Sequence, residues 1–83
     1  MYGANAQMDQ LIIHIAQSLV DRPQDVLVRT IEGASTMVLE LHVAKEDVGK
    51  VIGKQGKTAH AMRILIGAVS SKINKRAVLE IIE

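Results

Sequence analysis

The amino-acid sequence predicts an α+β domain in which three helices cover one face of a three-stranded mixed sheet. Apolar residues recur at the helical spacing of three or four near the start of the chain and again in its second half. Two segments between these regions show the period of two that is typical of strands, and a third candidate strand ends the chain. With 83 residues there is room for one domain, and its core must be aliphatic because Tyr2 is the single aromatic residue.

The first predicted element is an amphipathic helix over residues 6–20. Asn5 is its expected N-cap, and Pro23 ends it. Residues 1–5 are expected to form a flexible N-terminal end, which leaves residues 6–83 as the single domain. The apolar side of this helix follows the i, i+3, i+4, i+7 pattern and comprises Met8, Leu11, Ile12, Ile15, Ala16 and Leu19.

Two strands are expected next, over residues 26–32 and 36–44, and the Gly-Ala-Ser tripeptide between them suits an antiparallel hairpin. The first strand alternates imperfectly because Val28 and Ile31 have opposite parity, so we expect a bulge near residues 29–30. The second strand alternates cleanly, with a core face of Met37, Leu39, Leu41 and Val43 and an outer face of Val38, Glu40 and His42.

A short helix is expected over residues 45–52, followed by a glycine-containing loop and a longer helix from Lys57 to about Ile73. Glu46 and Asp47 lie in the first turn of the short helix, where the helix dipole favours negative charge, and this explains them better than an acid–base pair does. The long helix ends near Asn74 and is expected to bury Met62, Leu65, Ile66, Val69 and Ile73.

The final segment, AVLEIIE at residues 77–83, is predicted to be the third strand. A connection from the second strand through two helices requires a crossover, so the third strand should lie parallel to the second. The same connection places all the helices on one face of the sheet.

The stretch VIGKQGKT, residues 51–58, admits two functional interpretations. A nucleotide-binding P-loop needs glycine five residues before its final Gly-Lys-Thr, and Val51 occupies that position. The predicted context also differs, because a helix and not a strand comes before the loop. A four-residue G-x-x-G loop, Gly53–Gly56, fits the spacing and the context. Such a loop lets the backbone approach a sugar-phosphate strand, with Lys54 for phosphate and Gln55 for hydrogen bonding.

The segment VGKVIGKQGKTAHAMRIL, residues 48–65, resembles the V-I-G-x-x-G core of KH domains, and the helix-strand-strand start resembles their type II arrangement. From about Met8 to Glu83 the chain is similar to the small stand-alone bacterial KH proteins of the KhpA family. Lys45 stands where that family often has proline, a difference outside the loop. The resemblance implies a groove for about four unpaired nucleotides. Carried over position by position, its RNA-binding residues are Ile52, Gly53, Lys54, Gln55, Gly56, Lys57 and Thr58.

Charge and composition narrow the function further. Seven basic residues and no acidic one lie between Lys50 and Arg76, which is either a solubilising surface or a polyanion site. The start of this run near the glycine loop favours the second interpretation. The chain has no cysteine, its three histidines are scattered, and it shows no nucleophile–base arrangement. We therefore expect no catalytic residue, no metal and no cofactor. Whether His42, His60 or Arg63 face the groove depends on a rotation and a register that the sequence leaves open.

The leading hypothesis is a non-catalytic, cytoplasmic protein that binds single-stranded RNA, as a post-transcriptional regulator or RNA chaperone. Folds that bind RNA by aromatic stacking are excluded by composition, and no apolar segment is long enough to span a membrane. The alternative is an assembly module, since the resemblance also implies self-pairing and a larger Jag-like KH partner. Gly67 in the long helix suggests close packing, first within the monomer and otherwise at a dimer face with Ile64.

Overall fold

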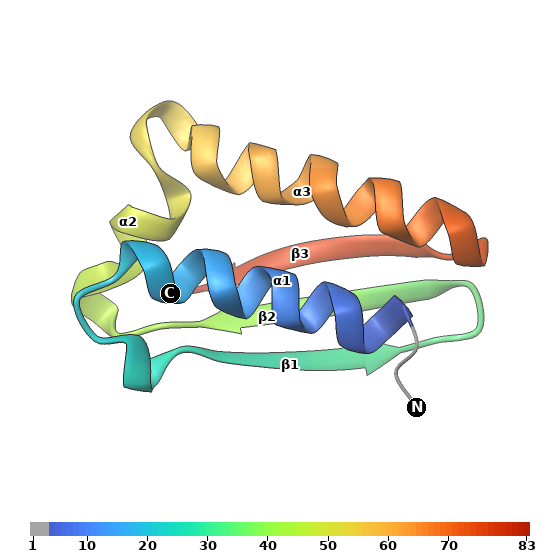
Figure 1. Ribbon diagram of the computed structural model, residues 1–83, viewed down its shortest axis with the longest axis horizontal. Coiled ribbons are helices and arrows are strands. Elements are labelled where there is room, and N and C mark those ends of the chain that lie inside the picture. Colours follow the sequence, from blue (N-terminus) through green and yellow to red (C-terminus); the bar gives the residue numbers. More distant parts are fainter. Residues whose placement is uncertain (1–3) are drawn as a thin grey trace.

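The computed structural model describes residues 4–83 and has the predicted order helix, strand, strand, helix, helix, strand (Figure 1). Short 3₁₀ turns at Pro23–Asp25, Lys45–Asp47, Lys54–Gly56 and Ser71–Ile73 lie between these elements. The α+β class and the type II order are confirmed. The elements are α1 (Ala4–Leu19), β1 (Leu27–Glu32), β2 (Thr36–His42), α2 (Val48–Ile52), α3 (Lys57–Ser70) and β3 (Arg76–Ile82).

Strand β2 is the centre of the sheet, whose order is β1-β2-β3. Strands β1 and β2 are antiparallel, and β2 and β3 are parallel with Thr36 opposite Arg76 and His42 opposite Ile82. The hairpin connection spans the three expected residues, and the Gly33 N–H donates to the Thr36 carbonyl at 2.7 Å. The crossover through α2 and α3 therefore produces the parallel pairing that the sequence predicts.

The bulge expected in the first strand is wrong. The register of β1 against β2 is unbroken from Leu27 to Glu32. The reason is that Thr30 takes the core-facing position, where its hydroxyl donates to Asp9 Oδ1 of α1 at 2.7 Å. A satisfied polar group thus replaces the expected apolar one. Leu27 and Ile31 remain on the outer face, 58% and 49% exposed.

One core lies between the sheet and the helices. Of the predicted core face of the second strand, Met37, Leu39 and Leu41 are fully buried, whereas Val43 lies just after β2 and is partly buried against the core. Elements α1, α2, α3 and β3 each contribute to the same cluster. Leu65, expected in this core, is 44% exposed, so that assignment is wrong. Helix α3 turns its Met62–Ile66 side to the sheet, and Leu65 lies about 100° around the helix from Ile66. The core comprises Met8, Ile12, Ala16, Met37, Leu39, Leu41, Val51, Met62, Ile66 and Leu79.

The first helix begins earlier than the sequence suggested. Because α1 starts at Ala4, Asn5 lies inside the helix, and its assignment as N-cap is wrong. Alanine is the strongest helix former, and with alanine at positions 4 and 6 the helix extends past the expected cap. Of the end expected to be flexible, residues 1–3 lie outside the described residues.

Candidate nucleic-acid interface

The Gly53–Gly56 loop joins α2 to α3 at one end of the molecule (Figure 1). It is a tight turn, in which the Gly53 N–H donates to the Gly49 carbonyl at 2.9 Å and the Gly56 N–H donates to the Gly53 carbonyl at 3.0 Å. Three of its four residues have positive φ: Gly53 at 79°, Gln55 at 58° and Gly56 at 72°. This backbone conformation strongly favours glycine, so the sequence pattern follows from the loop's shape.

The two loop glycines are required for different reasons. A Cβ added at Gly53 would lie 2.3 Å from Thr58 Oγ1 and 2.8 Å from the Thr58 backbone nitrogen. A Cβ at Gly56 would meet nothing within 4 Å, so only its positive φ calls for glycine. Thr58 thus packs against the start of the loop from the first turn of α3. The loop conformation is therefore tied to the relative placement of α2 and α3.

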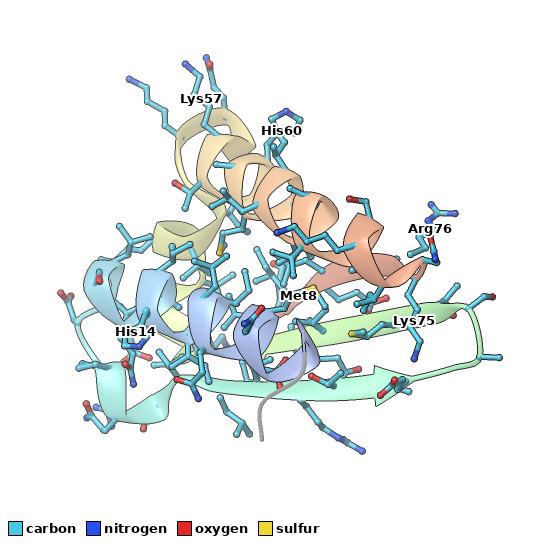
Figure 2. All side chains as sticks on the ribbon, turned by 45° about the vertical axis from the view of Figure 1, so that its right-hand side comes forward. Met8, His14, Lys57, His60, Lys75 and Arg76 are labelled. Atoms are coloured by element: carbon cyan, nitrogen blue, oxygen red, sulfur yellow. The ribbon has the colours of Figure 1, made fainter. Side chains whose placement is uncertain are left out.

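The side chains predicted to bind RNA gather around this turn. Lys54, Gln55 and Lys57 are exposed, while Ile52 and Thr58 are half-buried beside them. In Figure 2, Lys57 and His60 point away from the sheet at the loop end of α3. Within residues 4–83, the ion pairs and hydrogen bonds of basic side chains leave Lys54 and Lys57 without an acidic partner. Their positive charge is available to an external anion at the N-terminus of α3, where the helix dipole also favours negative charge.

The remaining basic residues of the Lys50–Arg76 run have other positions. Lys50 pairs with Asp21 and Asp47, and Lys75 pairs with Glu32 near the opposite end of α3. Arg63 Nη2 donates to the Leu79 carbonyl at 3.4 Å, which places the guanidinium between α3 and β3. Lys72 and Arg76 are exposed in the turn after α3 and at the start of β3, away from the loop. Within the described residues, the run that looks continuous in sequence therefore leaves two cations, Lys54 and Lys57, unpaired at the loop.

The histidines left open by the sequence can now be placed. His42 alternates with buried Leu41 on β2, so it lies on the sheet face away from the helices, where its Nε2 is 3.7 Å from Glu40. His60 is exposed on α3, one turn beyond the loop. The described part of the chain contains no group of three His, Cys, Asp or Glu side chains that could hold a metal ion.

A buried carboxylate near the loop was not identified as such from the sequence. Asp47 is fully buried and accepts hydrogen bonds from the backbone N–H of Asp21 at 3.3 Å and of Arg22 at 3.1 Å. Lys50 Nζ lies 3.1 Å from the Asp47 carboxylate and 2.5 Å from that of Asp21. Asp47 is therefore more than a charge at a helix start. These two backbone hydrogen bonds join residues that are 26 and 25 positions apart in the chain, so no local sequence pattern reveals them.

Burial raises the pKa of the Asp47 carboxyl, but the hydrogen bonds from Lys50 and from the two backbone N–H groups outweigh it. The net pKa is below the ordinary value for aspartate. The Lys50 pKa is raised, chiefly by its hydrogen bond to Asp21 and then by that to Asp47. Both groups are therefore charged at neutral pH.

A second surface lies on the side of α3 turned away from the core. Ile64 is 58% and Leu65 44% exposed, and small exposed residues flank them. A Cβ at Gly67 would meet nothing within 4 Å, so the expected packing of Gly67 inside the monomer is wrong. We call this surface the outer α3 face and define it as Ala61, Ile64, Leu65, Gly67 and Ala68. No helix in the described residues is both long and apolar enough to cross a membrane.

Comparisons with known proteins bear on the loop surface. Residues 9–81 match the family model described as KhpA/KhpB, KH domain. A Clostridium acetobutylicum protein named RNA-binding protein KhpA is 55% identical over 75 residues, which cover 90% of this chain and all of the relative. Proteins of the same name from Listeria monocytogenes and Chlamydia pneumoniae are 49% and 45% identical over 92% of this chain, covering 100% and 97% of their own length. No solved structure matches the chain.

Proposed function

Because this chain belongs to the KhpA/KhpB KH domain family, we propose that it is a non-catalytic protein that binds single-stranded RNA. The relatives carry the name RNA-binding protein, and the chain covers nearly their whole length. The observation that carries the proposal is a G-x-x-G loop with positive φ at three positions, which presents exposed Lys54 within it and exposed Lys57 directly after it, both without acidic partners in the described part of the chain. The protein would act in the cytoplasm on transcripts or ribosomal RNA, as a post-transcriptional regulator or RNA chaperone.

In the proposed complex the loop holds the sugar-phosphate backbone of about four nucleotides. Lys54 and Lys57 supply positive charge, Gln55 supplies a neutral hydrogen-bonding group, and half-buried Ile52 offers apolar contact to a base. Thr58 packs against Gly53 and so helps to maintain the backbone conformation of the loop. Single strands are preferred because the base edges of an A-form duplex are hidden from such a loop.

The number of free cations sets the strength of binding. Two lysine–phosphate contacts give a log–log dependence of affinity on salt with a slope of about −1.4 for a single strand. With so few charges, and no stacking aromatic in the described residues, one chain should bind with a dissociation constant on the order of micromolar or weaker. Useful affinity then requires a second site at high effective concentration.

We propose that a second chain supplies that site, either another copy or a larger Jag-like KH protein. The outer α3 face supports this because it presents two large aliphatic side chains and an unobstructed glycine. None of its five residues is charged, although Lys57 precedes Ala61 and Lys72 follows Ala68 by one helical turn, so an apolar surface lies between two positive charges. The outer α3 face contains none of the predicted RNA-binding residues, so the proposed pairing does not use the loop itself.

The test is the double variant Lys54→Asp with Gln55→Asp. Aspartate tolerates the left-handed conformation of position 55, so the fold should be retained while the local charge reverses. A matched control, Ser71→Asp with Lys72→Asp, makes the same charge change at the far end of α3. A helix of α3's length spans about 21 Å, beyond the screening length of about 8 Å. We expect the loop variant to lose at least tenfold in affinity for single-stranded RNA and the control to stay within about twofold. Equal affinity of the two variants would refute the loop as the binding site.

A further inference from the structure

Helix α2 carries the loop but has little holding it in place. It has five residues, too few for a helix that is stable by itself, and Val51 is its one fully buried side chain. Besides the packing of Val51 in the core, the position of α2 therefore depends on tertiary contacts at its two ends. At its C-terminal end Gly53 packs against Thr58 of α3, and at its N-terminal end stands Asp47.

Asp47 ties that N-terminal end to the turn after α1. One carboxylate oxygen accepts the Arg22 N–H, and the other accepts the Asp21 N–H and the Lys50 ammonium. Lys50 stands one turn further along α2 and reaches back to the Asp21 carboxylate. We call Asp47, Lys50, Asp21 and the backbone N–H of Arg22 the Asp47 network. Apart from the bond between Asp47 and Lys50 themselves, every bond in the network joins α2 or its N-cap residue to the α1–β1 turn.

We propose that Asp47 is a positioning residue for RNA binding, which sets the G-x-x-G loop by fixing α2 against the α1–β1 turn. The inference rests on the proposed RNA-binding function and assigns it a residue outside the loop. If α2 moves, Gly53 can no longer keep its close approach to Thr58, and the loop loses its left-handed shape. The apparent dissociation constant then rises by the reciprocal of the fraction of molecules that keep the competent loop.

Substitution by asparagine should break the network without changing the size of the side chain. Position 47 needs acceptors on both oxygens, because a backbone N–H or an ammonium group faces each of them. An asparagine has one oxygen and one N–H₂ group, so its N–H₂ must face one of these donors. That donor and the asparagine N–H₂ are then both left without an acceptor. The positioning role predicts that Asp47→Asn weakens RNA binding. Long-range electrostatics alone predicts tighter binding, because the substitution removes a negative charge near a site for a polyanion.

Glu46→Gln is the matched control for that charge. Glu46 is exposed and directly precedes Asp47, and its substitution by glutamine removes the same unit of charge.

Lys50→Met distinguishes a positioning role of Lys50 from a direct contact between Lys50 and phosphate. A lysine that touches phosphate contributes about 0.7 to the salt slope with a single strand, whereas Lys50, occupied by two carboxylates, should contribute nothing. Lys54→Met reports the slope change of a direct contact.

The experiment measures binding of the full chain to a fluorescently labelled single-stranded RNA of mixed sequence over a salt series. Far-UV circular dichroism confirms folding of each variant. We expect Asp47→Asn and Lys50→Met to bind about five- to fiftyfold more weakly than wild type with an unchanged salt slope. Glu46→Gln should bind as tightly as wild type or slightly more tightly. Lys54→Met should bind more weakly and should also show a shallower dependence of affinity on salt. Lys50→Arg, which can also bridge two carboxylates, should restore binding.

The outcomes separate two failures. If wild type does not bind the RNA, the proposed function is wrong and the role of Asp47 falls with it. If wild type binds and Asp47→Asn binds as tightly as Glu46→Gln, the positioning role is wrong and RNA binding stands. A reduced slope in Lys50→Met would make Lys50 a phosphate contact and would also overturn the inference. If Asp47→Asn does not fold, the affinity of Lys50→Met tests the inference, and wild-type affinity in that variant would overturn it. Lys50→Met should fold because the Lys50 side chain is 42% exposed and its removal leaves the two backbone hydrogen bonds to Asp47 intact.

Discussion

Gly53→Ala should be the most destabilising of three glycine-to-alanine changes in this chain. Gly53 has φ 79° and ψ 169°, a region that essentially only glycine occupies, and forcing another residue there costs about 1–3 kcal/mol. The new Cβ would also lie 2.7 Å from the Thr58 Cβ and 2.8 Å from its backbone nitrogen. The start of α3 must shift to relieve these contacts, at a further cost of about 1 kcal/mol or more. A total of about 3 kcal/mol corresponds to a fall in Tm of about 12–24 °C.

The other two glycines provide the scale for this value. At Gly56 the φ of 72° is strained for alanine but the space is open, so Gly56→Ala should cost about 1–2 kcal/mol. Gly67 lies inside α3 with nothing within 4 Å of a Cβ, so Gly67→Ala should stabilise the monomer by about 0.5–1 kcal/mol. The same substitution should weaken pairing if a partner backbone approaches this glycine.

Urea denaturation at low protein concentration, followed by circular dichroism, gives the three free energies of unfolding. The double variant Gly53→Ala with Thr58→Ala should remain destabilised, because it removes Oγ1 but keeps the Cβ and backbone contacts. A Gly53→Ala protein within about 0.5 kcal/mol of wild type would refute the account of the loop geometry. So would full rescue by Thr58→Ala.

Four further outcomes follow from the structure. Leu39→Ala should cost about 2–5 kcal/mol in urea denaturation because Leu39 is fully buried, while Val38→Ala on the outer sheet face should cost clearly less. Because the pKa of Asp47 is lowered in the folded protein, ionised Asp47 stabilises the fold at pH values above its unfolded-state pKa of about 3.9. This contribution disappears as pH falls through the folded-state pKa. At pH values below about 4, the free energy of unfolding should therefore decrease more steeply for wild type than for Asp47→Asn. Single-stranded RNA should be preferred over a duplex of the same sequence with a salt slope near −1.4, whereas a slope near −5 would point to nonspecific contact by all seven basic residues. Ile64→Asp should abolish self-association in sedimentation at high concentration, and a wild-type chain that is monomeric there would leave a different protein as the partner.

The sequence predicted the fold well because its signals are local. The period of two in β2 and the helical spacing in α1 each follow from one face of one element, and the crossover rule then determined the parallel third strand. The loop was predictable for the same reason. Gly53 and Gly56 are a direct consequence of the backbone dihedral angles at those positions.

The errors arose where distant residues decide. Thr30 could be assigned to the core only with knowledge of Asp9 across the sheet–helix interface, and without it Ile31 suggested a bulge. Leu65 and Ile66 are adjacent apolar residues, and only the rotation of α3 against the sheet decides which one is buried. Asp47 was assigned to a helix start because its partners in the α1–β1 turn are far away in the chain.

The central claim, that RNA binds at the G-x-x-G loop, is tested most directly by nuclear magnetic resonance. The ¹⁵N-labelled chain would be titrated with a short single-stranded RNA while the backbone amide signals are followed. We expect the largest shifts at residues 52–58, little change at Leu27, Arg29 and Ile31 on the outer sheet face, and loss of the shifts in the Lys54→Asp, Gln55→Asp variant. Shifts centred on the outer sheet face, or shifts at the loop that persist in the variant, would contradict the claim.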